Sequence, residues 1–324
     1  MKRKLSVNNL SFAEIGGVGE MVYKAVHFAD YGVTNLHDRD WIAPTFPSPL
    51  DPMKSGKDDK LTGQELLTSI CNLYHKMNDP GEKIDRNREL IVWCRENVHP
   101  YDIDSLCALA EELEPGTDAS TLIQHDAIFE PEKFIDDMCE VGRVFDYAFA
   151  LIEIKENGNT VPARRQYYEG RICDGFPFFE KYRDIEDDDK YVESVLDDFS
   201  EHTERLIDLI PDFRMRLKLD RDSGKVMYGA DVESVFDICW YTLSRIIADV
   251  APRTDQDPDE LFSQGKILSC LACGKFFVRH SSRQLYCDNP NCQAERNRRN
   301  RRASYARKKA AEVQNKARNN MKKT

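Results

Sequence analysis

The 324-residue sequence lacks any apolar run of the roughly 18–20 residues that a membrane-spanning helix requires. Its basic N-terminus, MKRKLSVNNLSFAEIGG, is followed by no apolar segment, so it does not resemble a secretory signal. No internal repeat is visible. With 41% hydrophobic and 32% charged residues, the composition predicts a packed core beneath a heavily charged surface. We therefore expect a soluble, cytoplasmic protein without a membrane partner.

Recognisable catalytic motifs are also lacking. The sequence contains no G-x-S-x-G, phosphate-binding loop, H-E-x-x-H or dinucleotide-binding fingerprint, and GGVGE (16–20) is interpreted as a turn because no Lys-Ser/Thr follows it. The seven histidines are dispersed, and HDRD (37–40) and QHDA (124–127) each pair one with an aspartate. We interpret these pairs as surface hydrogen bonds and predict no enzymatic activity. An active site assembled from residues distant in sequence is the alternative.

Six of the ten cysteines occur singly, without the clustering of a disulfide framework. Most lie beside apolar residues, as in IVWC (91–94) and FDICW (236–240). We interpret them as small buried side chains in a reducing compartment. They are Cys71, Cys94, Cys107, Cys139, Cys173 and Cys239.

Charge is distributed very unevenly along the chain. From Lys266 to the end there are 16 basic residues against three acids, a net charge of +13. The preceding residues carry 30 basic and 54 acidic groups, a net charge of −24. Such asymmetry predicts an acidic body with a basic arm that has a polyanionic partner.

The hydrophobic periodicity of the acidic part predicts a mainly α fold with a small β-hairpin. We expect an irregular segment at 1–60 packed on the body, with a short strand at KLSVNNLSF, and an acidic helical domain at 61–260. Two or three helices are predicted within 61–115. Single helices are predicted at 134–154, starting at Pro131-Glu132, at 184–210 and at 231–250, and the hairpin is predicted at 214–229.

Four cysteines in the pattern C-x2-C-x13-C-x4-C open the basic part: Cys270, Cys273, Cys287 and Cys292. Zinc binds four thiolates in a tetrahedron, and a C-x2-C pair at a tight turn brings two sulfurs onto one ion. Gly274 follows the second cysteine and suits such a turn, because glycine readily adopts positive φ. Four protein ligands leave no open coordination position, so we predict one structural Zn²⁺.

A four-cysteine zinc knuckle, like a zinc ribbon or treble clef, is therefore predicted within 264–324. KFFV and QLY are interpreted as short strands whose Phe276, Phe277 and Tyr286 form a small core. Two disulfides or four free thiols are the alternatives to zinc, and His280 is an alternative ligand in place of one cysteine.

A basic helix is predicted directly after the cysteines. Residues 294–323 contain no Gly or Pro and are rich in Ala, Arg and Lys, which favour helix. At about 100° per residue, most of the helix surface is cationic, and Tyr305 lies in the middle of this cationic face. Such a face suits a phosphate backbone, because each bound Lys or Arg releases condensed counterions. The opposite side is a narrow stripe of small residues: Ala303, Ala306, Ala310, Val313 and Ala317.

From this pattern we predict a nucleic-acid-binding protein that regulates transcription, with DNA preferred over RNA. The alternative is a protein-interaction or scaffolding factor whose basic tail docks on its own acidic body or on a partner protein. A protein partner or a homodimer contact through the helical body is left open. The residues expected to contact nucleic acid are Arg296, Arg298, Arg299, Arg301, Arg302, Tyr305, Arg307, Lys308 and Lys309.

The segment CLACGKFFVRHSSRQLYCDNPNCQAERNRRNRRASYARKK (270–309) resembles the CGNR-type zinc finger of bacterial regulator-like proteins. It also resembles uncharacterised bacterial proteins that end in a C-x2-C-G-K-x-F…Y-C-D…C module. The likeness covers about 45 residues, and the family's four metal positions fall on the cysteines of this segment. At the signature, Cys292-Gln293-Ala294-Glu295 stands where the family has Cys-Gly-Asn-Arg. The resemblance implies a helical N-terminal body, a zinc-bound finger and a DNA-binding tail.

Overall fold

The structure is a computed structural model in two compact units, Met1–Thr254 and Asp255–Thr324. The described residues are 6–12, 21–28, 30–45, 61–79, 81, 83–101, 127–157, 181–182, 184–220, 225–250, 267–281 and 284–321.

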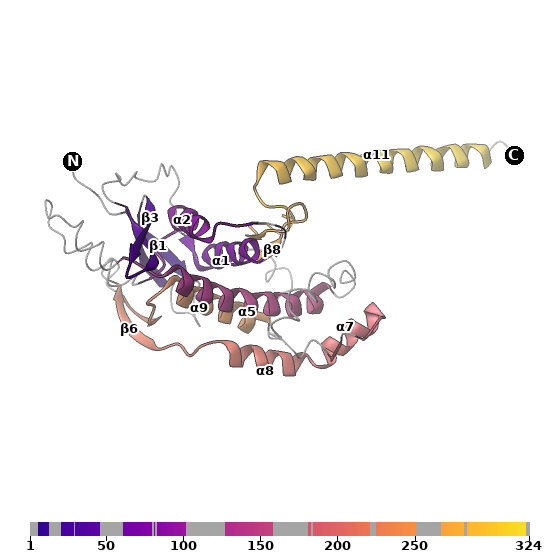
Figure 1. Ribbon diagram of the computed structural model, residues 1–324. Helices are drawn as coiled ribbons and strands as arrows, with labels where there is room; N and C mark the ends of the chain where they lie inside the picture. The colour runs from indigo at the N-terminus through magenta and orange to yellow at the C-terminus, as the bar shows by residue number, and fades with distance from the viewer. Residues whose placement is uncertain are drawn as a thin grey trace. The chain divides into compact units, whose positions relative to one another are not determined.

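Three helices, α1 (Gly63–Met77), α5 (Pro131–Asn157) and α9 (Val235–Val250), pack together to form the centre of the first unit (Figure 1). α5 and α9 confirm the predicted helices, and α5 begins at the expected proline. α1 and α5 approach closely: a Cβ on Gly142 would lie 2.4 Å from Cγ of Tyr74. Glycine is therefore required there by the contact itself.

A further helix, α2 (Arg86–Glu96), covers the same core. Asp85 caps its start, because its carboxylate accepts a hydrogen bond from the backbone N–H of Arg88. Together α1 and α2 account for two of the helices predicted within 61–115; residues 102–115 lie outside the described residues. The described part of this unit is thus mainly helical, as predicted.

The N-terminal part of the unit contains more strand than the sequence indicated. β1 (Ser6–Phe12), the strand predicted at KLSVNNLSF, pairs antiparallel with β2 (Met21–His27) and parallel with the short β5 (Leu61–Thr62). β3 (Tyr31–Leu36) and β4 (Arg39–Pro44) form a separate antiparallel hairpin.

The turn between β3 and β4 consists of His37 and Asp38, with φ of 52° and 60°. Both residues adopt the left-handed conformation that two-residue hairpins require, and neither is glycine or asparagine. The missing glycine signal explains why the sequence did not predict this hairpin. Both side chains are exposed, as expected for the HDRD segment; QHDA lies almost entirely outside the described residues.

The predicted hairpin is present as β6 (Met215–Asp220) and β7 (Lys225–Ala230), antiparallel with Leu217 opposite Tyr228. The long helix predicted at 184–210 is wrong in one respect. It is divided at Asp198 into α7 (Asp188–Asp197) and α8 (Phe199–Leu209). The Asp198 carboxylate accepts a hydrogen bond from Tyr182 at 2.7 Å and pairs with Lys181 at 2.8 Å, so tertiary contacts hold the break.

The described cysteines of the first unit are free thiols, as predicted for a chain without disulfides in this part. Cys71, Cys94 and Cys239 are buried and Cys139 is half-buried. Burial raises the pKa of all four thiols. Cys107 and Cys173 lie outside the described residues. Among the described helices, none is both long and apolar enough to cross a lipid bilayer.

Two of the described histidines of this unit are buried without a positive charge. His202 on α8 has a tyrosine hydroxyl at each ring nitrogen: Tyr147 2.9 Å from Nδ1 and Tyr182 2.8 Å from Nε2. Tyr182 donates its own hydrogen to Asp198, so its oxygen accepts from Nε2–H and leaves Nδ1 as the acceptor. Burial lowers the pKa of His202 to about 4.

His99 is the second such group. It is 1% exposed, its Nδ1 lies 3.2 Å from the hydroxyl of Tyr31, and its ring stacks on the Tyr31 ring. Burial lowers its pKa to about 3. Both histidines therefore stay neutral in the folded chain at a pH where an unfolded chain would begin to protonate them.

We predict that the first unit loses stability as pH falls below about 6.5, where unfolded histidine titrates. Because both folded pKa values lie below the unfolded value, the unfolded chain binds more protons between about pH 6.5 and 4. Each histidine should lower the free energy of unfolding by about 2 kcal/mol between pH 6.5 and 5. Urea denaturation followed by circular dichroism measures this dependence.

The test compares His202→Asn with His37→Asn, which lies on the exposed β3–β4 turn. His202→Asn should reduce the pH dependence by the share of one histidine, whereas His37→Asn should leave it unchanged. An equal pH dependence of the free energy of unfolding in the wild type and in His202→Asn would contradict the conclusion that His202 is neutral in the folded chain.

Candidate metal centre and basic helix

The first two cysteines lie on a tight turn between two short strands. β8 (Ile267–Ser269) pairs antiparallel with β9 (Phe276–Val278), and Cys270 follows β8 directly. The N–H of Gly274 donates to the carbonyl of Cys270 at 2.9 Å, which closes the turn around Cys273. Gly274 has a φ of 74°, so the predicted need for positive φ at this position is confirmed.

The other two cysteines come from the segment that leads into α11 (Pro290–Met321). Cys292 lies in the first turn of α11 and is buried, and Cys287 precedes the helix. Gln293 fixes the two against each other, because its Nε2 donates to the carbonyl of Cys287 at 2.8 Å. The helix therefore begins inside the cysteine cluster.

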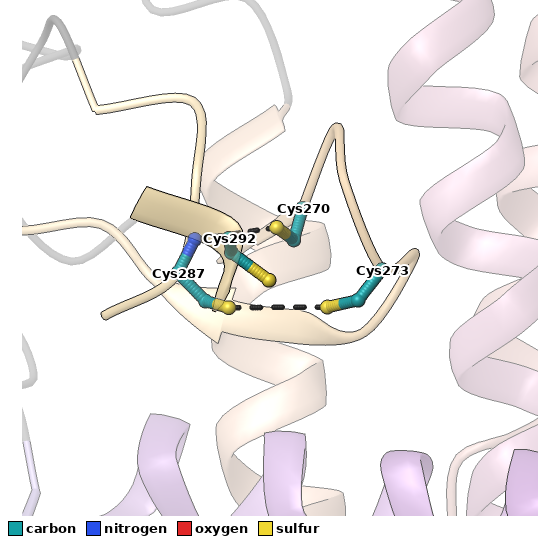
Figure 2. Close-up of side chains that lie close together, drawn as sticks. All are labelled: Cys270, Cys273, Cys287 and Cys292. Atoms are coloured by element: carbon teal, nitrogen blue, oxygen red, sulfur yellow. Dashed lines mark hydrogen bonds between the residues drawn. The ribbon is translucent and has the colours of Figure 1, made fainter. Parts of the chain in front are cut away.

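The four sulfurs converge on one point (Figure 2). All lie within 4.8 Å of one another, and Sγ of Cys273 is 3.8 Å from Sγ of Cys287. Four sulfurs placed about 2.3 Å from a central ion at tetrahedral corners are about 3.8 Å apart. The cluster therefore has the size of a four-thiolate metal site, and all four cysteines are free rather than joined as disulfides.

The environment of the cluster favours a bound cation. Burial raises the pKa of Cys270, but hydrogen bonds from the backbone N–H groups of Cys273, Cys287 and Ala272 outweigh this effect and lower the pKa to about 6. The N–H of Cys287 lies 3.4 Å from the Cys270 sulfur. Burial and the neighbouring thiols raise the pKa of Cys292. Four thiolates therefore need a metal ion to neutralise their mutual repulsion.

Sulfur-only ligation at tetrahedral size fits a structural metal ion, because no open position is left for a substrate. His280 is exposed and does not belong to the cluster, so the structure gives no support to its role as a ligand. Phe276 is buried beneath the turn, while Phe277 and Tyr286 are half-buried.

The strand prediction for this unit is only partly correct. KFFV forms β9, but QLY (284–286) is not a strand; β9 pairs instead with 267–269. The backbone carbonyl of Leu285 accepts a hydrogen bond from the N–H of Leu271 in the cysteine turn at 3.2 Å. The segment thus supports the cluster through an isolated contact, which leaves no ladder for a strand.

α11 follows the cluster as a single helix of 32 residues, or about 48 Å at 1.5 Å per residue. Asn289 caps its start: its side chain accepts from the N–H of Asn291 at 2.9 Å. Described side chains from Arg296 to Lys309 are exposed, and Tyr305 is 70% exposed. The nine residues predicted to contact nucleic acid therefore all lie on accessible surface.

Glu295 divides these nine residues into those that it binds and those that it does not, a feature that the sequence did not predict. Its carboxylate binds Arg298 at 2.8 Å and Arg299 at 3.1 Å. These contacts raise the pKa of Arg299 and lower that of Glu295. Within the described residues, Arg301, Arg302, Lys308 and Lys309 form no ion pair. The i, i+3 and i, i+4 spacing from Glu295 was the signal that could have shown this.

Comparison of the chain with protein-family models, with curated proteins and with solved structures gives no match.

We predict that the purified full-length chain binds one metal ion per molecule and that Cys292→Ser weakens this binding. The loss should exceed the roughly 10–100-fold that removal of a residue merely supporting a ligand gives, because a coordinating sulfur is lost. Inductively coupled plasma mass spectrometry after dialysis against a chelator measures the bound metal.

The matched control is Cys139→Ser, which removes a half-buried thiol of the first unit. It should retain the wild-type metal content. Full metal content in Cys292→Ser would rule out a four-sulfur site.

Proposed function

We propose that the chain is a zinc-stabilised nucleic-acid-binding protein in which the cysteine cluster orients the basic face of α11. The observation that carries the proposal is the position of Cys292 in the first turn of that helix. A metal ion held by the cluster fixes the helix start, so the cationic residues that follow project from a rigid base.

Zinc is the proposed ion because its preferences match the site. It favours tetrahedral thiolate ligation, has no redox chemistry and binds with about 10 kcal/mol or more in small protein units at neutral pH. The second unit requires such a contribution, since few of its described side chains are buried and hydrophobic burial alone does not stabilise so small a core. Those side chains are Ile267, Cys270, Phe276, Arg279 and Cys292.

Nucleic acid is the proposed partner because of the arrangement of charge on α11. Arg298, Arg302, Tyr305 and Lys309 follow one another at intervals of three or four residues, so they lie along one side of the helix. Arginine and lysine bind phosphates, and an exposed tyrosine can stack on a base or donate to a phosphate. The acidic first unit repels a polyanion, which leaves the second unit as the binding element.

DNA is the proposed nucleic acid and transcriptional regulation in a bacterial cytoplasm the proposed role, both on the resemblance of residues 268–312 to the CGNR-type finger. The exposed Ala303 and Ala306 support a second candidate function, in which α11 docks on a protein through its stripe of small residues. The two functions differ in their dependence on salt.

We predict that full-length, zinc-loaded protein binds random duplex DNA with an affinity that falls steeply with salt. Engagement of about six charges gives a slope of roughly −5 in log K against log salt, or about a 1,000-fold loss between about 50 and 200 mM. Arg301/Arg302→Ala should reduce the magnitude of the slope by about two, because neither arginine is held by Glu295. Fluorescence anisotropy at several salt concentrations, with duplex DNA and single-stranded RNA, measures both.

The control is Arg86/Arg88→Ala, which removes two exposed arginines from α2 in the acidic unit. It should bind as the wild type does. Binding that is absent at low salt in full-length protein, or a salt slope that the α11 variant leaves unchanged, would refute the nucleic-acid function and favour the protein-docking one. If single-stranded RNA binds more tightly than duplex DNA, RNA replaces DNA as the proposed target.

A further inference from the structure

The first unit contains a cavity of about 530 Å³ that the sequence analysis did not foresee. It is bordered by Trp41 on β4, by Tyr101, by residues 128–130 with the first two turns of α5, and by residues 233–234 with the first two turns of α9. Its volume lies within the range of small-molecule sites in proteins. Four separate parts of the chain thus converge on one concave surface.

Aromatic rings form much of the wall: Trp41, Tyr101, Phe129, Phe236 and Trp240. Tyr101 is the link between them, with its ring centroid 5.7 Å from that of Phe129 and 5.8 Å from that of Phe236. Aromatic faces carry partial negative charge and attract cations, most strongly flat ones that also stack.

Carboxylates supply the remaining charge of the wall. Asp137 on α5 accepts a hydrogen bond from the Tyr101 hydroxyl at 2.7 Å. Asp237 on α9 accepts through one oxygen from the N–H groups of Glu233 and Ser234, at 2.9 and 2.8 Å. Burial raises the pKa of Asp137, and the nearby Asp237 adds to this effect. A cation in the cavity would relieve the repulsion between these two groups.

The lining contains one basic residue, Lys133, against the acids Glu130, Asp137, Glu233 and Asp237. Its Nζ lies 4.4 Å from the centroid of the Tyr101 ring. The wall therefore already holds one cation against an aromatic face, and a negative balance remains after that lysine is counted.

We propose that this cavity binds a flat organic cation, such as an amidinium, a guanidinium compound or a protonated amino-heterocycle. The cation lies against the aromatic rings and donates to Asp137. The site does not depend on the proposed function of the second unit.

The test uses three probes of nearly equal size and shape that differ in charge: benzamidine as the cation, benzamide as the neutral analogue and benzoate as the anion. Two of the three tryptophans line the cavity, so tryptophan fluorescence of the full-length protein reports binding. At constant ionic strength, benzamidine should bind saturably and at least tenfold more tightly than the other two. Equal binding of all three probes, or tighter binding of benzamide or benzoate, would overturn the proposal.

Two substitutions should change benzamidine affinity in opposite directions. Asp137→Asn keeps the acceptor for Tyr101 but removes the charge, and should weaken binding at least tenfold. Lys133→Met removes the competing cation and should tighten it several-fold. Glu132→Gln is the control, since it removes an exposed carboxylate from the first turn of α5 outside the cavity.

Circular dichroism verifies that each variant is folded. If Asp137→Asn does not fold, Glu233→Gln replaces it, because the exposed Glu233 contributes its backbone to the α9 cap. Unchanged benzamidine affinity in a folded Asp137→Asn or Glu233→Gln, or weaker binding in Lys133→Met, would contradict a cation site.

Discussion

The convergence of four cysteine sulfurs is the interaction on which the second unit depends. Three of them belong to turns and loops, and the fourth belongs to the first turn of a 32-residue helix. Thiolates at this spacing repel one another, so a cation bound at their centre would stabilise the cluster. The metal ion proposed for this site would close the small core and would also determine where α11 starts. Removing the ion would release the helix from its anchor as well as unfold the knuckle.

The two units handle charge by different physical means. In the first unit, acidic groups on the surface surround an interior in which His99 and His202 are kept neutral by burial and by tyrosine hydroxyls. In the second, cationic side chains remain exposed on one helix, where Glu295 binds Arg298 and Arg299. A polyanion would thus be attracted only by the basic second unit, and an organic cation only by the acidic first unit.

Local sequence signals predicted what local interactions determine. The cysteine spacing, the positive φ of Gly274, the start of α5 at a proline and the β6–β7 hairpin were all evident from a few adjacent residues. The break at Asp198 was not, because Lys181 and Tyr182 hold it from outside the helix. Nor was the aromatic cavity, which forms only when β4, α5 and α9 meet. The β3–β4 hairpin escaped because its turn uses His37 and Asp38 instead of the usual glycine.

The straightness of α11 limits how much of it can follow a double helix. A groove curves away from a rigid rod after about half a helical turn of DNA, roughly 17 Å, which matches about 11 residues of α-helix. The exposed cationic stretch from Arg296 to Lys309 has about this length. The residues of α11 beyond it would then extend past such a contact.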